Sequence, residues 1–127
     1  MDTTRLGELR HFHLRLGPGE DLFGSLRAFL EEEGLTRAFV LSTIGSLRRV
    51  VVNYPSSVTD NPEIGSVVLE GAFEINGISG EVWREDGGIR VHLHGSVTLK
   101  AGTLYGGGLG EGAVVLKLAE MVLAGVK

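Results

Sequence analysis

Alternation of apolar and polar residues near the start of the chain predicts a half-buried β-strand. From Arg10 to Leu16, Phe12 and Leu14 fall on one face, and His11 and His13 fall on the other. Successive side chains of a strand point to opposite sides of the sheet, so one face can meet a core while the other meets water. We therefore expect the first strand at residues 10–16.

Apolar residues at helical spacing follow this strand. Glu20 and Asp21 begin the segment, and acidic residues favour the N-terminus of a helix. Gly34 follows a run of glutamates at the expected C-terminus. The apolar positions of the segment are Leu22, Phe23, Leu26, Phe29 and Leu30. The pattern therefore predicts one principal helix.

Two apolar runs that are rich in strand-forming residues come next. They cover Ala38 to Ile44 and Arg48 to Tyr54, and Gly45-Ser46 separates them. Glycine between two such runs is a turn signal, so we expect the runs to pair as a hairpin. Pro55 to Gly65 is rich in proline, serine, aspartate and asparagine, and it is predicted to be an exposed loop.

Short strands separated by turn signals continue toward the C-terminus. The expected strands are Ser66 to Leu69, Ala72 to Ile75, Ile78 to Trp83 and Ile89 to Leu99. Asn76-Gly77 is a strong signal for a tight turn. The glycine-rich segment from Gly102 to Gly112 is expected to be a loop. Ala113 to Leu123 fits either a buried strand or an apolar helix, because periodicity alone does not distinguish them.

One helix and about seven strands place the chain in the α+β class. Strands that follow one another without crossover helices pair antiparallel, so we expect a curved, mostly antiparallel sheet with one principal helix. The 127 residues contain no linker or repeat and fit a single domain over residues 1–127. The 20 glycines are spread along the chain, as in a curved, strand-rich structure.

Composition narrows the classes of function. The absence of cysteine excludes disulfides, thiolate metal sites and cysteine nucleophiles, and it fits a reducing compartment. The sequence shows no secretory signal and no apolar run long enough to span a bilayer, so we expect a cytoplasmic protein without membrane contact. The net charge of -4 does not favour binding to DNA phosphates, although Arg48 and Arg49 form an adjacent basic pair.

Five motifs in register over nearly the whole chain resemble those of one known family. Each motif alone has low specificity, but their common order and spacing are specific. They are Leu16 to Leu22, Ala38 to Leu47, Glu70 to Ile75, His92 to Ser96 and Gly102 to Leu109. On these motifs the chain resembles the domain conserved in plants and prokaryotes, called the PPC or PCC domain.

The resemblance implies a curved antiparallel sheet with one helix and assembly as a homotrimer. In plants the domain follows an AT-hook, an Arg-Gly-Arg-Pro segment that this sequence does not contain. Stand-alone prokaryotic members are described as predicted DNA-binding proteins. The resemblance thus implies a non-enzymatic binding module whose partner is AT-rich DNA or a protein. The candidate binding residues are Arg48, Arg49, Glu74, Gly106, Gly107 and Gly108.

All four histidines lie in two His-x-His pairs, His11/His13 and His92/His94. Alternation places both members of a pair on one face of a strand. Two imidazoles and a third ligand from a loop make a zinc site with one open position. The resemblance implies that the third histidine comes from the glycine-rich segment, where this chain has Gly108.

Two functions of different classes remain open on the sequence alone. The first is the non-enzymatic binding module, for which no cofactor and no catalytic residue are expected. The second is a metal-dependent, lyase-like enzyme that uses zinc at His92 and His94. It needs a third ligand, which His11, His13 or Glu74 could supply only if the fold brings one of them near.

Overall fold

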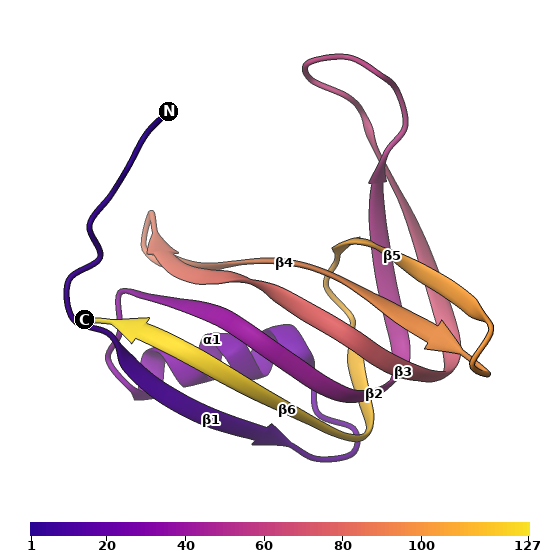
Figure 1. Ribbon diagram of the computed structural model, residues 1–127, viewed down its shortest axis with the longest axis horizontal. Helices are drawn as coiled ribbons and strands as arrows, with labels where there is room; N and C mark the ends of the chain where they lie inside the picture. The colour runs from indigo at the N-terminus through magenta and orange to yellow at the C-terminus, as the bar shows by residue number, and fades with distance from the viewer.

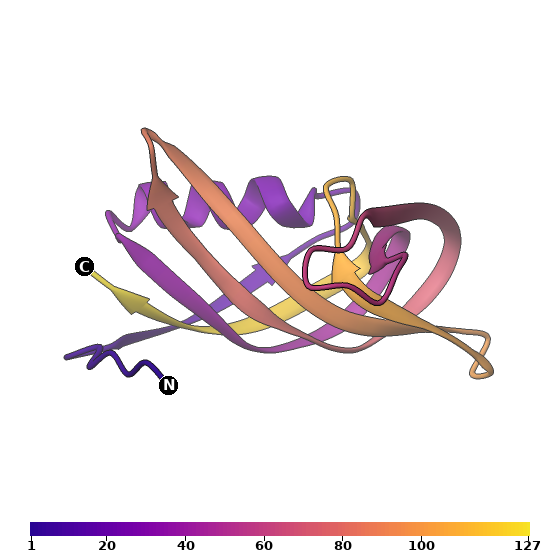
Figure 2. The same ribbon diagram turned by 90° about the horizontal axis from the view of Figure 1, so that it is seen from above.

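The structure of the protein is a computed structural model that describes residues 1–127. It consists of six β-strands and one α-helix (Figure 1). The strands make one antiparallel sheet in the order β1-β6-β2-β3-β4-β5, and the helix lies against one of its faces (Figure 2). The elements are β1 (Arg10–Leu16), α1 (Leu22–Glu32), β2 (Arg37–Pro55), β3 (Ile64–Glu85), β4 (Gly88–Leu99), β5 (Thr103–Leu109) and β6 (Val114–Val126). The α+β class and the mostly antiparallel sheet agree with the sequence prediction.

The sheet curls at one end until its strands close a ring of pairings. β5 pairs with β4 along its length, and it also pairs with β2, where Val52 faces Leu109 and Asn53 faces Gly108. Strands β2, β3, β4 and β5 therefore form a closed set, while β1 stays at an open edge of the sheet. The ring places the glycine-rich strand β5 between β4 and the end of β2.

β2 is one continuous strand of 19 residues, so the hairpin expected around Gly45-Ser46 is wrong. Gly45 faces Ile75 of β3 and Ala119 of β6, and its backbone has a φ of 137°. A Cβ at this position would lie 2.1 Å from the carbonyl oxygen of Leu118. The glycine therefore permits the close approach of β6 and does not reverse the chain.

The sheet has six strands rather than about seven because expected short strands merge into longer ones. β3 runs through Asn76-Gly77 without the tight turn expected there, and its register against β4 shifts between Ile75 and Gly77. The pair therefore lies at a bulge instead of a turn. The expected loop from Gly102 to Gly112 is also wrong, because residues 103–109 form β5. The last segment, 114–126, is a strand.

The predicted helix is confirmed and packs its apolar face on the sheet. The Asp21 side chain accepts a hydrogen bond from the backbone N–H of Gly24 at 3.0 Å, which caps the helix N-terminus. Gly34 adopts a φ of 63° just after the helix, as the sequence indicates for its end. Phe29 stacks edge-to-face on Phe12 of β1 with ring centroids 5.1 Å apart. With 11 residues, the helix does not have the length to cross a bilayer.

Two arginines join the helix region to the sheet and its loops. Arg27 of α1 donates to the carbonyl oxygen of Ile89 at 3.3 Å and forms an ion pair with Glu111. The hydrogen bond to Glu111 raises the pKa of the Arg27 guanidinium. Arg84 of β3 donates to the carbonyl oxygen of Leu35 at 2.9 Å and to Glu31 at 2.9 Å. These contacts hold the middle of the helix against β4 and its C-terminal end against β3.

Candidate functional site

His92 and His94 lie next to each other on β4, on the strand face opposite the buried Leu93. Their Nε2 atoms are 3.2 Å apart, and the two rings are nearly perpendicular at 84°. In a neutral pair one Nε2 donates a hydrogen bond and the other accepts it. Two ring nitrogens that converge in this way can share a proton or bind one metal ion.

Position 108 of β5 faces this histidine pair. Gly108 pairs with His94 in the sheet register, and a Cβ at position 108 would lie 3.7 Å from the Nε2 atom of His94. A side chain at this position would therefore begin beside the imidazole of His94. The fold thus places His92, His94 and Gly108 together, and the glycine leaves the space beside the imidazoles open.

A cavity of about 380 Å³ surrounds the histidine pair. Gly106, Gly107 and Gly108 of β5 form one wall, and the end of β2 with Tyr54 forms another. Ile64 at the start of β3 completes the rim and is 65 % exposed. A concave surface that joins apolar walls to two polar nitrogens is typical of small-molecule sites.

No third metal ligand joins the histidine pair. The structure contains no group of three or more His, Cys, Asp or Glu side chains that could hold one ion. His11 and His13 belong to β1, and β6, β2 and β3 lie between β1 and β4 in the sheet. Glu74 faces Thr98, which lies four residues beyond His94 on β4. The residues present fit two ligands of a zinc site but do not complete it.

Arg48 and Arg49 are exposed on β2, and neither forms an ion pair. They line a cavity of about 300 Å³ together with Glu70 and Val114. Arg49 faces Glu70 in the register of β2 and β3, so a carboxylate offsets part of this positive charge. This cavity shares no residue with the cavity at the histidines. The predicted binding residues therefore do not form a single site.

Glu74 lies on the exposed surface of β3. It faces Ser46 on β2 and Thr98 on β4, and it takes part in no ion pair. Its neighbours Phe73 and Ile75 are buried on the other face of the strand. The Glu74 carboxylate therefore faces away from the core.

Sequence reasoning missed a group of exposed apolar side chains on the sheet face that α1 does not cover. Leu41 and Ile44 of β2 are 54 % and 58 % exposed, and Leu116 and Val122 of β6 are 38 % and 40 % exposed. We call these four residues the apolar face. The sequence from Ala38 to Ile44 indicated this group, because its apolar residues do not alternate with polar ones. Continuous apolar runs of this kind are typical of strands that are covered on both faces.

Curated relatives of the chain include a bifunctional protein GlmU from Synechococcus sp. (strain JA-3-3Ab), which is 36 % identical over 118 residues. The match covers 93 % of this chain but 17 % of the relative, so the chain spans a small part of that protein's length. A second GlmU, from Synechococcus sp. (strain JA-2-3B'a(2-13)), is 35 % identical over the same share of both chains.

Solved structures share the fold over nearly all of the chain. A metal-containing protein from Archaeoglobus fulgidus is 28 % identical, with a TM-score of 0.85 over 100 % of this chain and 86 % of that one. A plant- and prokaryote-conserved protein from Pyrococcus horikoshii is 29 % identical, with a TM-score of 0.81 over 98 % and 85 % of the two chains. A family model described as the Plants and Prokaryotes Conserved (PCC) domain matches residues 4–127. The chain therefore belongs to the Plants and Prokaryotes Conserved domain family.

Proposed function

We propose that the protein is a non-enzymatic binding module that acts as a homotrimer. The apolar face carries this proposal, because Leu41, Ile44 and Val122 are exposed while α1 lies on the other face of the sheet (Figure 2). Grouped, exposed apolar side chains on a soluble protein mark surfaces that bind other molecules. Contact with further copies of the chain would remove these side chains from water. The number of three copies rests on the family resemblance.

Ionisable side chains lie beside the apolar residues of this face. Ile44 faces Glu120 in the register of β2 and β6. Glu120 lies 3.5 Å from Nε2 of His13 and 3.7 Å from Nε of Arg15, so these three groups form a polar margin along β1. A contact on this face would therefore combine apolar side chains with the Glu120 carboxylate, and interfaces between proteins contain both apolar and polar area.

Light scattering coupled to size-exclusion chromatography tests the role of the apolar face. An Ile44→Glu variant places a charge at its centre, and we expect it to run as a monomer while the unmodified protein runs as a trimer. The matched control is Val58→Glu, because Val58 is fully exposed in the loop between β2 and β3 and lies off this face. A trimeric Ile44→Glu variant would rule out the apolar face as the contact surface.

DNA is the partner that we propose to test first. Two structurally similar proteins, from Bacteroides thetaiotaomicron and Ralstonia eutropha, are described as candidate DNA-binding proteins. They are 15 % and 18 % identical to this chain, so this likeness is one of fold. Arg48 and Arg49 are exposed without an ion-pair partner, and a trimer would present the pair three times. Phosphate contacts from such pairs would be strongly sensitive to salt.

Fluorescence anisotropy with an AT-rich duplex tests DNA binding at low and at near-physiological salt. We expect saturable binding that weakens with salt, exceeds binding to a GC-rich duplex and falls in an Arg48→Gln/Arg49→Gln variant. Arg5→Gln/Arg10→Gln is the control, because both arginines lie outside the cavity at Arg48. Absent or salt-insensitive binding by the unmodified protein would discard the DNA proposal.

A second candidate function is a metal-dependent, lyase-like enzyme at the histidine pair. The observation that favours it is the 3.2 Å separation of the two Nε2 atoms inside a cavity of about 380 Å³. The metal-containing relative from Archaeoglobus fulgidus adds support through its fold and its 28 % identity. The missing third ligand is the argument against it.

Zinc analysis of untagged protein separates the two candidate functions. A metal enzyme requires close to one equivalent of zinc per chain, and His94→Ala should remove it. Less than about a tenth of an equivalent would end the metal-enzyme proposal, because functional zinc sites bind tightly enough to stay occupied during purification. That result would leave the binding-module proposal intact.

A further inference from the structure

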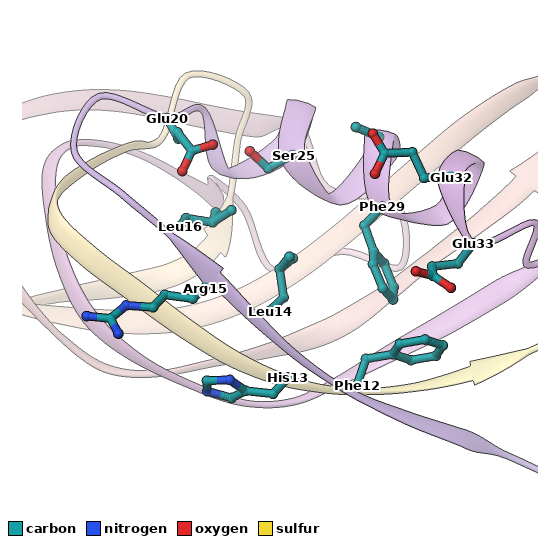
Figure 3. A pocket seen from close by; sticks show the side chains of 11 residues that line it. Phe12, His13, Leu14, Arg15, Leu16, Glu20, Ser25, Phe29, Glu32 and Glu33 are labelled. Carbon is teal, nitrogen blue, oxygen red and sulfur yellow. The ribbon is translucent and has the colours of Figure 1, made fainter.

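A groove of about 350 Å³ runs between the open edge of the sheet and the helix (Figure 3). Its floor is apolar and is formed by side chains of β1 and α1, namely Phe12, Leu14, Leu16 and Phe29. Its rim is acidic and belongs to the helix side, where the carboxylates are Glu20, Glu32 and Glu33. We call this feature the edge groove. It shares no residue with the histidine cavity or with the apolar face.

The edge groove follows a strand that has one free side. β1 pairs with β6 and with no other strand. In an antiparallel pair the backbone N–H and C=O groups point alternately toward and away from the partner, so half of those on β1 have no partner in the sheet. The groove is lined by Leu14 on one side of β1 and by His13 on the other, so it reaches around this free edge. An extended peptide could therefore add to the sheet there.

The electrostatics of the edge groove favour a cationic ligand. The end of α1 carries Glu31, Glu32 and Glu33, and its last turn contains no basic residue. The C-terminus of a helix has a partial negative charge, so these carboxylates add to a field of the same sign. Arg84 neutralises Glu31 at 2.9 Å, whereas Glu32 and Glu33 take part in no ion pair. A lysine or arginine that enters the groove would meet both free carboxylates.

We propose that the edge groove binds an extended, basic peptide segment of a partner protein by strand addition to β1. Lysine or arginine at alternate positions of the peptide would point into the groove. Their aliphatic stems would pack over Phe12 and Phe29, and their charged ends would reach Glu32 and Glu33. The residues between them would point to the side of His13 and Arg15, where uncharged side chains avoid repulsion from the Arg15 guanidinium.

Two other occupants fit the groove less well. Pairing of β1 with β1 of a second copy would place the acidic rims of both chains close together, and like charges repel. Residues 1–9 carry Asp2, Arg5 and Glu8 and therefore have no positive net charge among their side chains. The basic partner peptide does not depend on trimer formation or DNA binding, so this proposal goes beyond the proposed function and fails separately from it.

Fluorescence anisotropy with a labelled peptide, Thr-Lys-Val-Arg-Thr-Lys-Val, tests this proposal on the full chain. We expect saturable binding that is at least about tenfold weaker in Glu32→Gln/Glu33→Gln, since two charge-assisted contacts are lost. The variant Asp60→Asn/Glu63→Gln is the matched control, because it removes the same charge from the distant β2–β3 loop region and should leave the affinity unchanged. Ala28→Arg should abolish binding, because Ala28 is exposed and lines the groove.

N-methylated peptides test the strand addition itself. Methylation of every second amide blocks one edge of the peptide, and we expect one of the two alternate sets to abolish binding while the other set preserves it. Equal binding of both methylated peptides, equal binding of a peptide with glutamate in place of the basic residues, or no binding of the original peptide would overturn the proposal. A change in oligomer mass in Ala28→Arg would also overturn it, because the groove would then be a contact between copies.

Discussion

The Nε2 atoms of His92 and His94 lie 3.2 Å apart, and a Cβ at position 108 would lie 3.7 Å from the Nε2 atom of His94. The family resemblance places a third histidine at this position, where Gly108 stands in this chain. The pair therefore supplies two of the three imidazoles that an open zinc site would need, and the register of β4 and β5 places position 108 beside it.

A Gly108→His variant should bind about one equivalent of zinc per chain, because it supplies the third imidazole of an open site. The Cβ contacts at this position are 3.5 Å or longer, so the backbone accepts the substitution. Zinc content by mass spectrometry and a zinc-dependent rise in Tm measure the effect. Gly108→Ala is the control for the backbone change, and adding His92→Ala should remove the bound zinc. A Gly108→His protein without zinc would contradict the geometry of the site.

Gly45→Ala should destabilise the protein by about 3 kcal/mol, because it combines backbone strain with a clash inside the sheet. Gly45 has a φ of 137°, and its Cβ would lie 2.1 Å from the carbonyl oxygen of Leu118. Gly77→Ala is the control, since nothing lies within 4 Å of that Cβ. Urea unfolding of both variants measures the difference, and similar stabilities would show that Gly45 is not a point of close approach.

Leu26→Ala should lower the free energy of unfolding by about 2–5 kcal/mol, because it leaves a cavity between α1 and the sheet. Leu26 is fully buried in the core. Leu104→Ala on β5 removes the same atoms from a side chain that is 64 % exposed, so its cost should be small. Thermal unfolding distinguishes the two, and a neutral Leu26→Ala would mean that the helix does not pack as described.

Glu33→Gln should stabilise the free protein by about 0.3–1 kcal/mol, because it removes a negative charge from the negative end of α1. Glu31→Gln is the informative comparison, since Glu31 accepts a hydrogen bond from Arg84 at 2.9 Å and its loss should not stabilise. Chemical unfolding at low salt measures both changes, and screening by salt should reduce the gain. If Glu33→Gln destabilises the protein, then the negative charge of Glu33 is not unfavourable at the end of the helix.

The helix and the first strand could be predicted from the sequence because each has a single clear period. Leu22, Leu26 and Phe29 repeat at helical spacing, and Phe12 and Leu14 alternate with exposed residues. The long strands could not be predicted in the same way. A glycine within an apolar run is compatible with a turn and also with the close approach of two backbones. At Gly45 the approach comes from β6, whose residues are far away in the sequence.

The candidate site was predictable to the extent that it depends on one strand. Alternation places His92 and His94 on one face of β4, and the structure has them there. The distance of His11 and His13 from this pair depends on the order of strands in the sheet, which periodicity does not encode. The edge groove depends on the same order, because its exposed backbone exists only if β1 is an edge strand.

The mass of the unmodified protein in solution tests the central claim most directly. Sedimentation equilibrium over a wide range of concentration would measure it without a tag or label. The homotrimeric binding module predicts a single species at three times the chain mass of 13.5 kDa. A protein that stays at the mass of one chain throughout that range would contradict the account, because the apolar face would then have no second copy to cover it.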